Sequence, residues 1–169
     1  MANAYETGQR KAIPAVLIYP RFGDDVLMLH RNVKERDFHA GKWNGLGGKC
    51  EPDESPLEAA ARELREESGL DLATEAFRPL GVLQFPNFKP GPVEDWLVFV
   101  FSAAVASKEL KSPTGPEGTL EWVRRDKLLD LNLWAGDREF LPLVLEGRPF
   151  IGTFWYQGGD LVRHWLRPF

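Results

Sequence analysis

The sequence is poor in cysteine, in histidine and in long apolar runs. It holds one cysteine, Cys50, and three histidines, too few for an intramolecular disulfide framework or a cysteine-rich zinc site. The longest apolar stretch, residues 96–106, is far shorter than the roughly 20 residues that span a bilayer, and the polar N-terminus lacks a signal-peptide core. These absences predict a cytoplasmic protein with no membrane partner.

The chain also lacks an excess of positive charge. It has 21 Lys and Arg against 25 Asp and Glu, for a formal net charge of -4. A DNA duplex is therefore not the expected partner, because binding to a long polyanion needs a positive field. The length of 169 residues fits a single domain, which we expect over residues 11–169, after a tail of residues 1–10.

Apolar runs and turn residues predict a mixture of strands and a few helices. The clearest helix begins at Ser55, a good N-cap, continues through Pro56 and Glu58, and ends at Gly69. A second helix is expected over residues 137–145. The expected strands cover residues 15–19, 26–31, 80–85, 96–105, 120–124, 150–156 and 161–166. This pattern indicates an α+β or mixed α/β sandwich, with a mixed sheet flanked by helices.

Three carboxylates crowd on the first helix. Glu66 and Glu67 follow Glu63 by three and four residues, so all three share one patch of the helix surface. Such a cluster suits a divalent cation with oxygen ligands, Mg²⁺ or Mn²⁺ rather than zinc. The alternative is a solvated acidic face with Arg62 and Arg65 as partners.

The spacing around these glutamates is more specific than the cluster itself. From Gly48, five residues lead to Glu54 and seven more lead to the run Arg62-Glu63-Leu64-Arg65-Glu66-Glu67-Ser68-Gly69-Leu70. This pattern resembles the complete signature of the Nudix hydrolases. The resemblance implies a Nudix α/β/α sandwich with this helix on one face, and a metal-dependent hydrolase of nucleoside diphosphates linked to another moiety.

The chemistry of the glutamates agrees with that resemblance. Metal ions that bridge diphosphate oxygens stabilise the charge of the transition state, and no arrangement for a covalent intermediate is present, so we expect direct attack by water. Arg62 would orient a glutamate, and Glu54 would anchor the loop at the helix start. The expected metal ligands are Gly47 through a close backbone approach, Glu63, Glu66, Glu67 and, by resemblance, Glu117, which lies five residues before Trp122; Asp126, Asp130 and Glu121 are the alternatives.

Segments outside the signature resemble the oxidised purine nucleoside triphosphatases, which cleave 8-oxo-dGTP to the monophosphate and diphosphate. The likeness covers residues 38–49, 134–143 and 150–160. It implies that Trp134 stacks on the purine while Asn44 and Asp137 bond its edges, which suits an indole platform and paired donors and acceptors. The remaining expected substrate-binding residues are Phe38 as a wall of the pocket, Leu46, and Arg31 near the phosphates.

Two positions depart from that branch. The branch places two acids in a row after the tryptophan, whereas here Gly136 precedes Asp137, which puts the breadth of base recognition in question. Arg31 stands where the branch has a lysine, with three extra residues before Phe38. Arginine keeps the charge of lysine but changes the geometry.

The leading hypothesis is therefore a Mg²⁺-dependent hydrolase that splits oxidised purine nucleoside triphosphates between the α and β phosphates. The alternatives are a Nudix hydrolase of nucleoside diphosphate sugars, dinucleotides or RNA 5′-triphosphates, a non-catalytic nucleotide sensor, and a domain that merely carries an acidic helix. Six Trp and eleven Phe would serve a core or a dimer surface equally, so the sequence leaves the oligomeric state open.

Overall fold

A computed structural model describes residues 1–33, 36–91 and 93–169. Residues 34 and 35, in the segment between Arg31 and Phe38 where the three extra residues fall, lie outside the described part. The strands are β1 (Lys11–Phe22), β2 (Asp25–His30), β3 (Trp43–Asn44), β4 (Leu46–Lys49), β5 (Phe77–Pro86), β6 (Glu94–Ala104), β7 (Thr119–Arg124), β8 (Phe150–Gln157) and β9 (Asp160–Pro168). The helices are α1 (Pro56–Ser68) and α2 (Ala135–Glu146), with short 3₁₀ turns η1 (Thr74–Ala76) and η2 (Arg125–Asp130).

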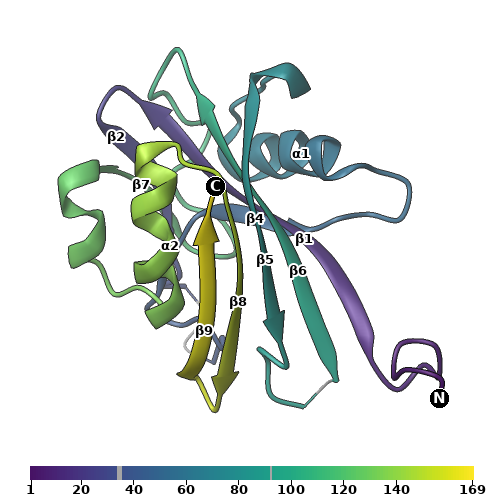
Figure 1. The fold of residues 1–169 in the computed structure, drawn as a ribbon. Coiled ribbons are helices and arrows are strands. Elements are labelled where there is room, and N and C mark those ends of the chain that lie inside the picture. Colours follow the sequence, from purple (N-terminus) through teal and green to yellow (C-terminus); the bar gives the residue numbers. More distant parts are fainter. Residues whose placement is uncertain (34–35, 92) are drawn as a thin grey trace.

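The strands form a mixed sheet (Figure 1). The order along the main path is β3-β2-β1-β6-β5-β8-β9, while β4 pairs with β1 and β7 pairs with β2. The β1–β6 and β5–β8 pairs are parallel and the others are antiparallel. Because β1 is paired with β6 along its length and with β4 over residues 15–18, its central residues lie in the middle of the molecule.

The two faces of the sheet are buried under different helices. Side chains alternate along a strand, and in β1 Val16 and Ile18 join the core cluster that contains Ala60 and Leu64 of α1. Ala15 and Tyr19 join the cluster that contains Phe140 and Leu141 of α2. The expected α+β sandwich, with the glutamate-rich helix on one face, is therefore confirmed.

Two local expectations need correction. The expected strands do not include residues 43–49, but residues 43–44 and 46–49 form β3 and β4, whose shortness and glycine content leave no alternating apolar pattern. The second helix begins at Ala135 rather than Asp137. The N-terminal segment that leads into β1 contacts the sheet, because Tyr5 and Arg10 both bond to the carboxylate of Asp95.

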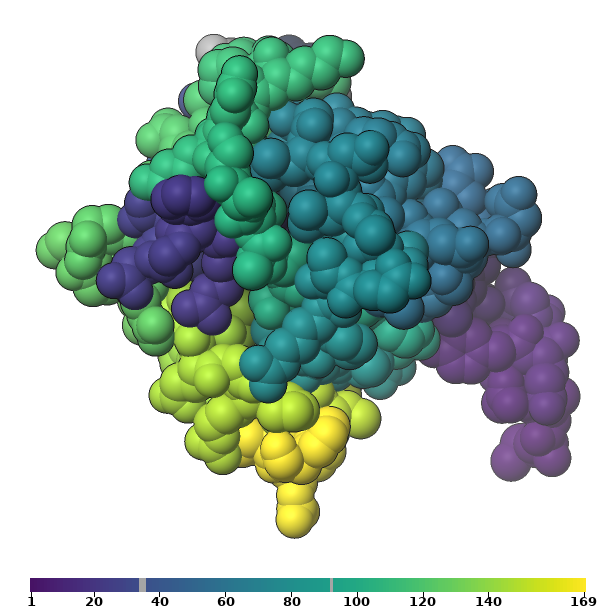
Figure 2. Space-filling view, turned by 90° about the horizontal axis from the view of Figure 1, so that it is seen from above, coloured from purple at the N-terminus to yellow at the C-terminus, as the bar shows by residue number. Residues whose placement is uncertain are grey.

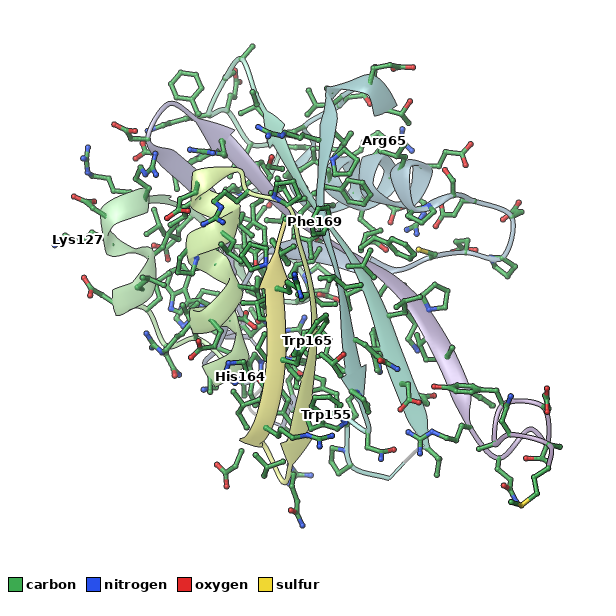
Figure 3. The ribbon with its side chains drawn as sticks, in the orientation of Figure 1. Arg65, Lys127, Trp155, His164, Trp165 and Phe169 are labelled. Atoms are coloured by element: carbon green, nitrogen blue, oxygen red, sulfur yellow. The ribbon has the colours of Figure 1, made fainter. Side chains whose placement is uncertain are left out.

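The ends of the chain lie at the periphery. The first residues project from one side of the molecule (Figure 2), and β9 forms an edge of the sheet, with Trp165 about half exposed (Figure 3). Among the described residues, no helix combines the length and the apolar character needed to cross a membrane.

Candidate active site

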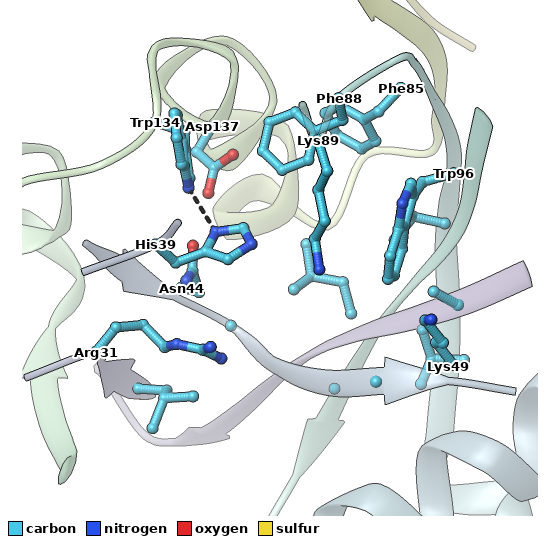
Figure 4. Close-up of a pocket in the computed structure, with 18 of the residues that line it drawn as sticks. Arg31, His39, Asn44, Lys49, Phe85, Phe88, Lys89, Trp96, Trp134 and Asp137 are labelled. Atoms are coloured by element: carbon cyan, nitrogen blue, oxygen red, sulfur yellow. Dashed lines mark hydrogen bonds between the residues drawn. The ribbon is translucent and has the colours of Figure 1, made fainter. Parts of the chain in front are cut away.

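A cavity of about 430 Å³ opens between the sheet and the loops that precede α2 (Figure 4). Its lining has two chemically different regions. Glycine backbone and charged side chains form one region: Gly47, Gly48, Lys49, Glu63, Arg31 and Glu117. Aromatic and hydrogen-bonding side chains form the other: Trp134, Asp137, Asn44, His39, Phe88, Phe85 and Tyr156.

The first helix is fixed at both ends by its own sequence. The Ser55 hydroxyl accepts the N–H of Glu58 at 3.3 Å, and the Glu58 carboxylate accepts the N–H of Ser55 at 2.7 Å. At the other end Gly69 adopts a φ of 79°, and its N–H donates to the carbonyl of Arg65 at 2.9 Å. These caps satisfy backbone groups that a helix leaves unpaired, so the helix presents its glutamates at a defined position beside β4.

Arg62 holds several carboxylates together. Its guanidinium donates to Glu54 at 2.6 and 3.0 Å, to Glu63 at 2.9 Å and to Glu66 at 3.3 Å. A fourth group, the Lys49 carbonyl, accepts from the same side chain at 3.1 Å. The structure therefore brings Arg62, Glu54 and Glu63 together. These bonds restrain the Glu63 side chain.

Glu67 lies deeper than its neighbours and contacts the backbone of β4. Its carboxylate accepts the N–H of Gly47 at 3.0 Å. Burial, and then the carboxylates of Glu117 and Glu63, raise the pKa of Glu67 to about 8. The pKa of Glu63 is also raised, first by burial and further by Glu66 and Glu117. Carboxylates on the helix and in the loop before β7 therefore repel one another.

This donor set fits a divalent cation. Its members are carboxylate oxygens, which hard cations such as Mg²⁺ and Mn²⁺ prefer. A cation would relieve the repulsion that helps to raise the pKa values of Glu63 and Glu67. Among the described residues, no three His, Cys, Asp or Glu side chains stand close enough, as placed, to enclose a metal ion. Glu66 is more than half exposed, and Glu117 bonds instead to Arg31 at 2.8 Å.

Gly47 is required by both the sheet and the site. Its φ is +151°, and a Cβ placed there would lie 2.0 Å from the Val16 carbonyl oxygen. The backbone of β4 therefore has no room for a side chain where it passes Glu67.

We expect Gly47→Ala to lower the free energy of unfolding by at least about 1–3 kcal/mol, because the new Cβ forces β4 away from β1. Urea denaturation measures this. Gly115→Ala is the matched control, since nothing lies within 4 Å of a Cβ at Gly115. Equal denaturation midpoints for the two variants would contradict the expectation.

The aromatic region of the cavity brings together the residues expected to bind the base. Trp134, Asp137 and Asn44 all line it. The Trp134 Nε1–H donates to Nδ1 of His39 at 3.0 Å, and burial lowers the pKa of His39 to about 4, so the imidazole is a neutral acceptor. Phe38 stacks on Trp134 with ring centroids 5.1 Å apart and is not among the residues that line the cavity. It supports the indole instead of forming the pocket wall.

Leu46 lies elsewhere. Its side chain is fully buried in the core cluster under α1, with Ala59 and Leu64. The structure does not bring this side chain to the cavity, because strand alternation turns it away from the lining that Gly45 and Gly47 form.

Several lining residues carried no signal in the sequence. Lys89 and Phe88 follow β5 in the turn at Asn87, which adopts a φ of 49°. Trp96 on β6 has the ammonium groups of Lys89 and Lys49 at 4.6 and 5.3 Å from its ring centroid. No motif marks these residues, since a turn and strand pairing bring them to the cavity.

Burial raises the pKa of Asp137 to about 7, although Lys42 and Arg138 act in the opposite direction. Because the folded-state pKa exceeds that of the unfolded chain, the folded protein holds the extra proton between about pH 4 and 7. The contribution of Asp137 to stability is therefore largest below about pH 4 and is lost as the pH rises to about 7.

We expect the free energy of unfolding of the wild type, relative to Asp137→Asn, to fall between pH 5 and pH 8. The amide cannot ionise, so the difference between the two proteins isolates this group. Urea denaturation at several pH values measures it, and a difference that is independent of pH would show that Asp137 is already ionised at pH 5.

Comparisons with known proteins agree with this geometry. A model of the NUDIX domain matches residues 9–144. The chain is 37% identical over 130 residues to an oxidized purine nucleoside triphosphate hydrolase of Danio rerio, which covers 77% of this chain and 80% of that protein. The enzyme of that name from Mus musculus is 31% identical over 134 residues, with the same coverage. The crystal structure of a mutator MutT protein from Bacillus halodurans superimposes with a TM-score of 0.78 at 31% identity, covering 91% of this chain and 97% of that one.

Proposed function

Because the chain belongs to the Nudix hydrolase family, we propose that it hydrolyses oxidised purine nucleoside triphosphates, such as 8-oxo-dGTP, to the monophosphate and diphosphate. Nudix hydrolases generally act on nucleotides with the help of a divalent metal. The observation that carries the proposal is the single cavity in which Trp134 and Asp137 share a lining with Gly48, Glu63 and Glu117. Such a cavity accepts a base in one region and phosphates in the other.

The aromatic region supplies recognition of the base. The indole of Trp134 stacks on a purine, an interaction worth about 1–3 kcal/mol. Asn44 offers a donor and an acceptor to one edge of the base, and Asp137 offers a carboxyl group to another. Since these groups are held by β3 and the start of α2, they are in place before the nucleotide arrives.

The charged region supplies the chemistry. Mg²⁺ or Mn²⁺, held by Glu63, Glu66, Glu67 and Glu117, would neutralise the charge that develops on the diphosphate. Arg31 and the glycine backbone of β4 bind phosphate oxygens. A carboxylate among the helix glutamates accepts the proton of the attacking water.

The test is a comparison of kcat/KM for 8-oxo-dGTP, 2-oxo-dATP, dGTP, a nucleoside diphosphate sugar and a dinucleoside polyphosphate, with the products identified. We expect 8-oxo-dGTP to exceed dGTP by at least about tenfold, which corresponds to roughly 1.4 kcal/mol. Equal or faster turnover of the sugar or the dinucleotide would overturn the roles of Asn44, Trp134 and Asp137 while leaving the helix assignment in place.

One observation favours a second candidate. Trp96 offers another indole to the same cavity, with Lys49 and Lys89 beside it. A dinucleoside polyphosphate carries a second aromatic base beyond its phosphates, which this indole would stack. The dinucleotide in the panel decides between the two candidates.

A further inference from the structure

Gly136 leaves no room for a side chain at the start of α2. A Cβ built at this position would lie 2.6 Å from the Tyr156 hydroxyl oxygen and 2.8 Å from Cδ1 of Phe154. Both residues come from β8, which is distant in sequence. The hydroxyl of Tyr156 thus occupies the space that a residue with a side chain at position 136 would fill.

Tyr156 is placed to contact a ligand. It lines the cavity together with Trp134 and Asp137. Its ring lies nearly perpendicular to the indole of Trp134, with centroids 5.7 Å apart, and packs edge-on against Phe88 at 5.0 Å. The ring therefore borders the region where a base would stack, and its hydroxyl lies beside Gly136, one residue before Asp137.

The hydrogen bonds of this hydroxyl leave its proton unused. Its oxygen accepts the N–H of Gly136 at 2.8 Å. No other hydrogen bond of the hydroxyl occurs within the part of the chain that the structure describes. Since a phenol has one proton to donate, that proton is available to a bound molecule.

We propose that Tyr156 determines base specificity by donating its hydroxyl proton to a carbonyl oxygen on the purine edge next to Asp137. The substrate class is then purines that carry a carbonyl rather than an amino group at C6. This proposal rests on the proposed function and refines it. An amino group at C6 would have to donate to the phenol oxygen, leaving the phenol proton unpaired, which is costly in a buried site.

The chemistry of the phenol suits this role. Burial and the neighbouring Asp137 raise the pKa of Tyr156 above its ordinary value. The hydroxyl thus keeps its proton while Asp137 titrates near pH 7. The pocket therefore combines the Tyr156 hydroxyl, which keeps a proton to donate, with the Asp137 carboxyl group, which changes from hydrogen-bond donor to acceptor when it ionises.

A purely structural role is the competing explanation. The Trp134 side chain gives α2 no cap, so the Tyr156 hydroxyl also satisfies one of the unpaired N–H groups of the first turn. Loss of a cap lowers stability and affects all substrates in the same way. A ratio of two substrates therefore separates the two roles.

The experiment compares kcat/KM for 8-oxo-dGTP, with a carbonyl at C6, and 8-oxo-dATP, with an amino group there. We expect Tyr156→Phe to reduce the ratio of the two values by about 5–20-fold, through the loss of one hydrogen bond to the carbonyl. Tyr5→Phe is the control for the same chemical change, since the Tyr5 hydroxyl bonds to Asp95 and neither residue belongs to the cavity lining. It should leave the ratio unchanged.

An unchanged ratio for Tyr156→Phe, or an equal loss for both substrates, would overturn the proposal. Should Tyr156→Phe fail to fold, Gly136→Ala displaces the hydroxyl without removing it, and the same reduction of the ratio is expected. Failure of the proposed function has a different signature, because the wild type would then hydrolyse a nucleoside diphosphate sugar or a dinucleotide at least as fast as 8-oxo-dGTP.

Discussion

Glu67→Gln is expected to reduce kcat by about 10²–10⁴-fold, the range over which a carboxylate that moves a proton contributes. The amide keeps the size of the side chain and its acceptor for the Gly47 N–H. It cannot take a proton from water or carry the negative charge that a cation needs. Steady-state kinetics with 8-oxo-dGTP and Mg²⁺ measure the loss.

Although Glu67→Gln lowers kcat, it should raise the free energy of unfolding relative to the wild type at high pH. The pKa of Glu67 is raised to about 8 by burial and by Glu117 and Glu63. The wild type therefore loses the contribution of this group as the pH rises from about 4.5 to about 8, whereas the glutamine variant does not. With metal removed by a chelator, Glu67→Gln should be the more stable protein at pH 9, as measured by thermal unfolding.

Glu75→Gln is the control for both measurements, because this substitution makes the same chemical change in an exposed turn. It should leave kcat and stability unaltered. Full turnover by Glu67→Gln at saturating Mg²⁺ would remove Glu67 from the catalytic machinery and leave Glu63 and Glu66 as the candidates.

The parts of the fold that depend on local chemistry were predictable from the sequence. Ser55, Pro56 and Gly69 fix the bounds of α1 through capping and a left-handed glycine, and these bounds are confirmed. The spacing from Gly48 to Leu70 identifies the family. These signals depend on residues that are close together in the chain, so they can be recognised without knowing how the strands pair.

The parts that depend on long-range pairing were not predictable. Gly47 belongs to a strand because β1 lies beside it, with Leu17 opposite. Leu46 points into the core for the same reason. Tyr156 reaches the start of α2 from a strand twenty residues later in the chain. Such contacts join separate segments of the chain, and no sequence pattern in either segment predicts the pairing.

Arg62→Ala should damage both stability and activity. The guanidinium joins Glu54 and Glu63, whose side chains are only 12% and 15% exposed, so its loss leaves clustered carboxylates unpaired. Breaking a buried pair costs about 3–5 kcal/mol; since Arg62 itself is 20% exposed, solvent screening reduces this to roughly 2–3 kcal/mol. Activity should fall about 10–100-fold, as it does when a residue that orients metal ligands is removed.

A lysine variant separates the charge of Arg62 from its geometry. Arg62→Lys keeps the charge but contacts fewer acceptors than the planar fork, so it should recover stability more than activity. Arg65→Ala is the control on the same helix, because Arg65 is 57% exposed and lies 3.8 Å from Asp71 (Figure 3); a change within about 0.5 kcal/mol is expected.

The kinetic parameter that changes identifies what Arg62 does. If it positions Glu63 for a cation, Arg62→Ala should raise the Mg²⁺ concentration for half-maximal activity while the KM for 8-oxo-dGTP stays near that of the wild type. A rise in the nucleotide KM alone would assign the arginine to phosphate binding instead. The bonds to Glu54, Glu63 and the Lys49 carbonyl already engage the guanidinium on several sides, which favours the first outcome, because a phosphate would have to displace them.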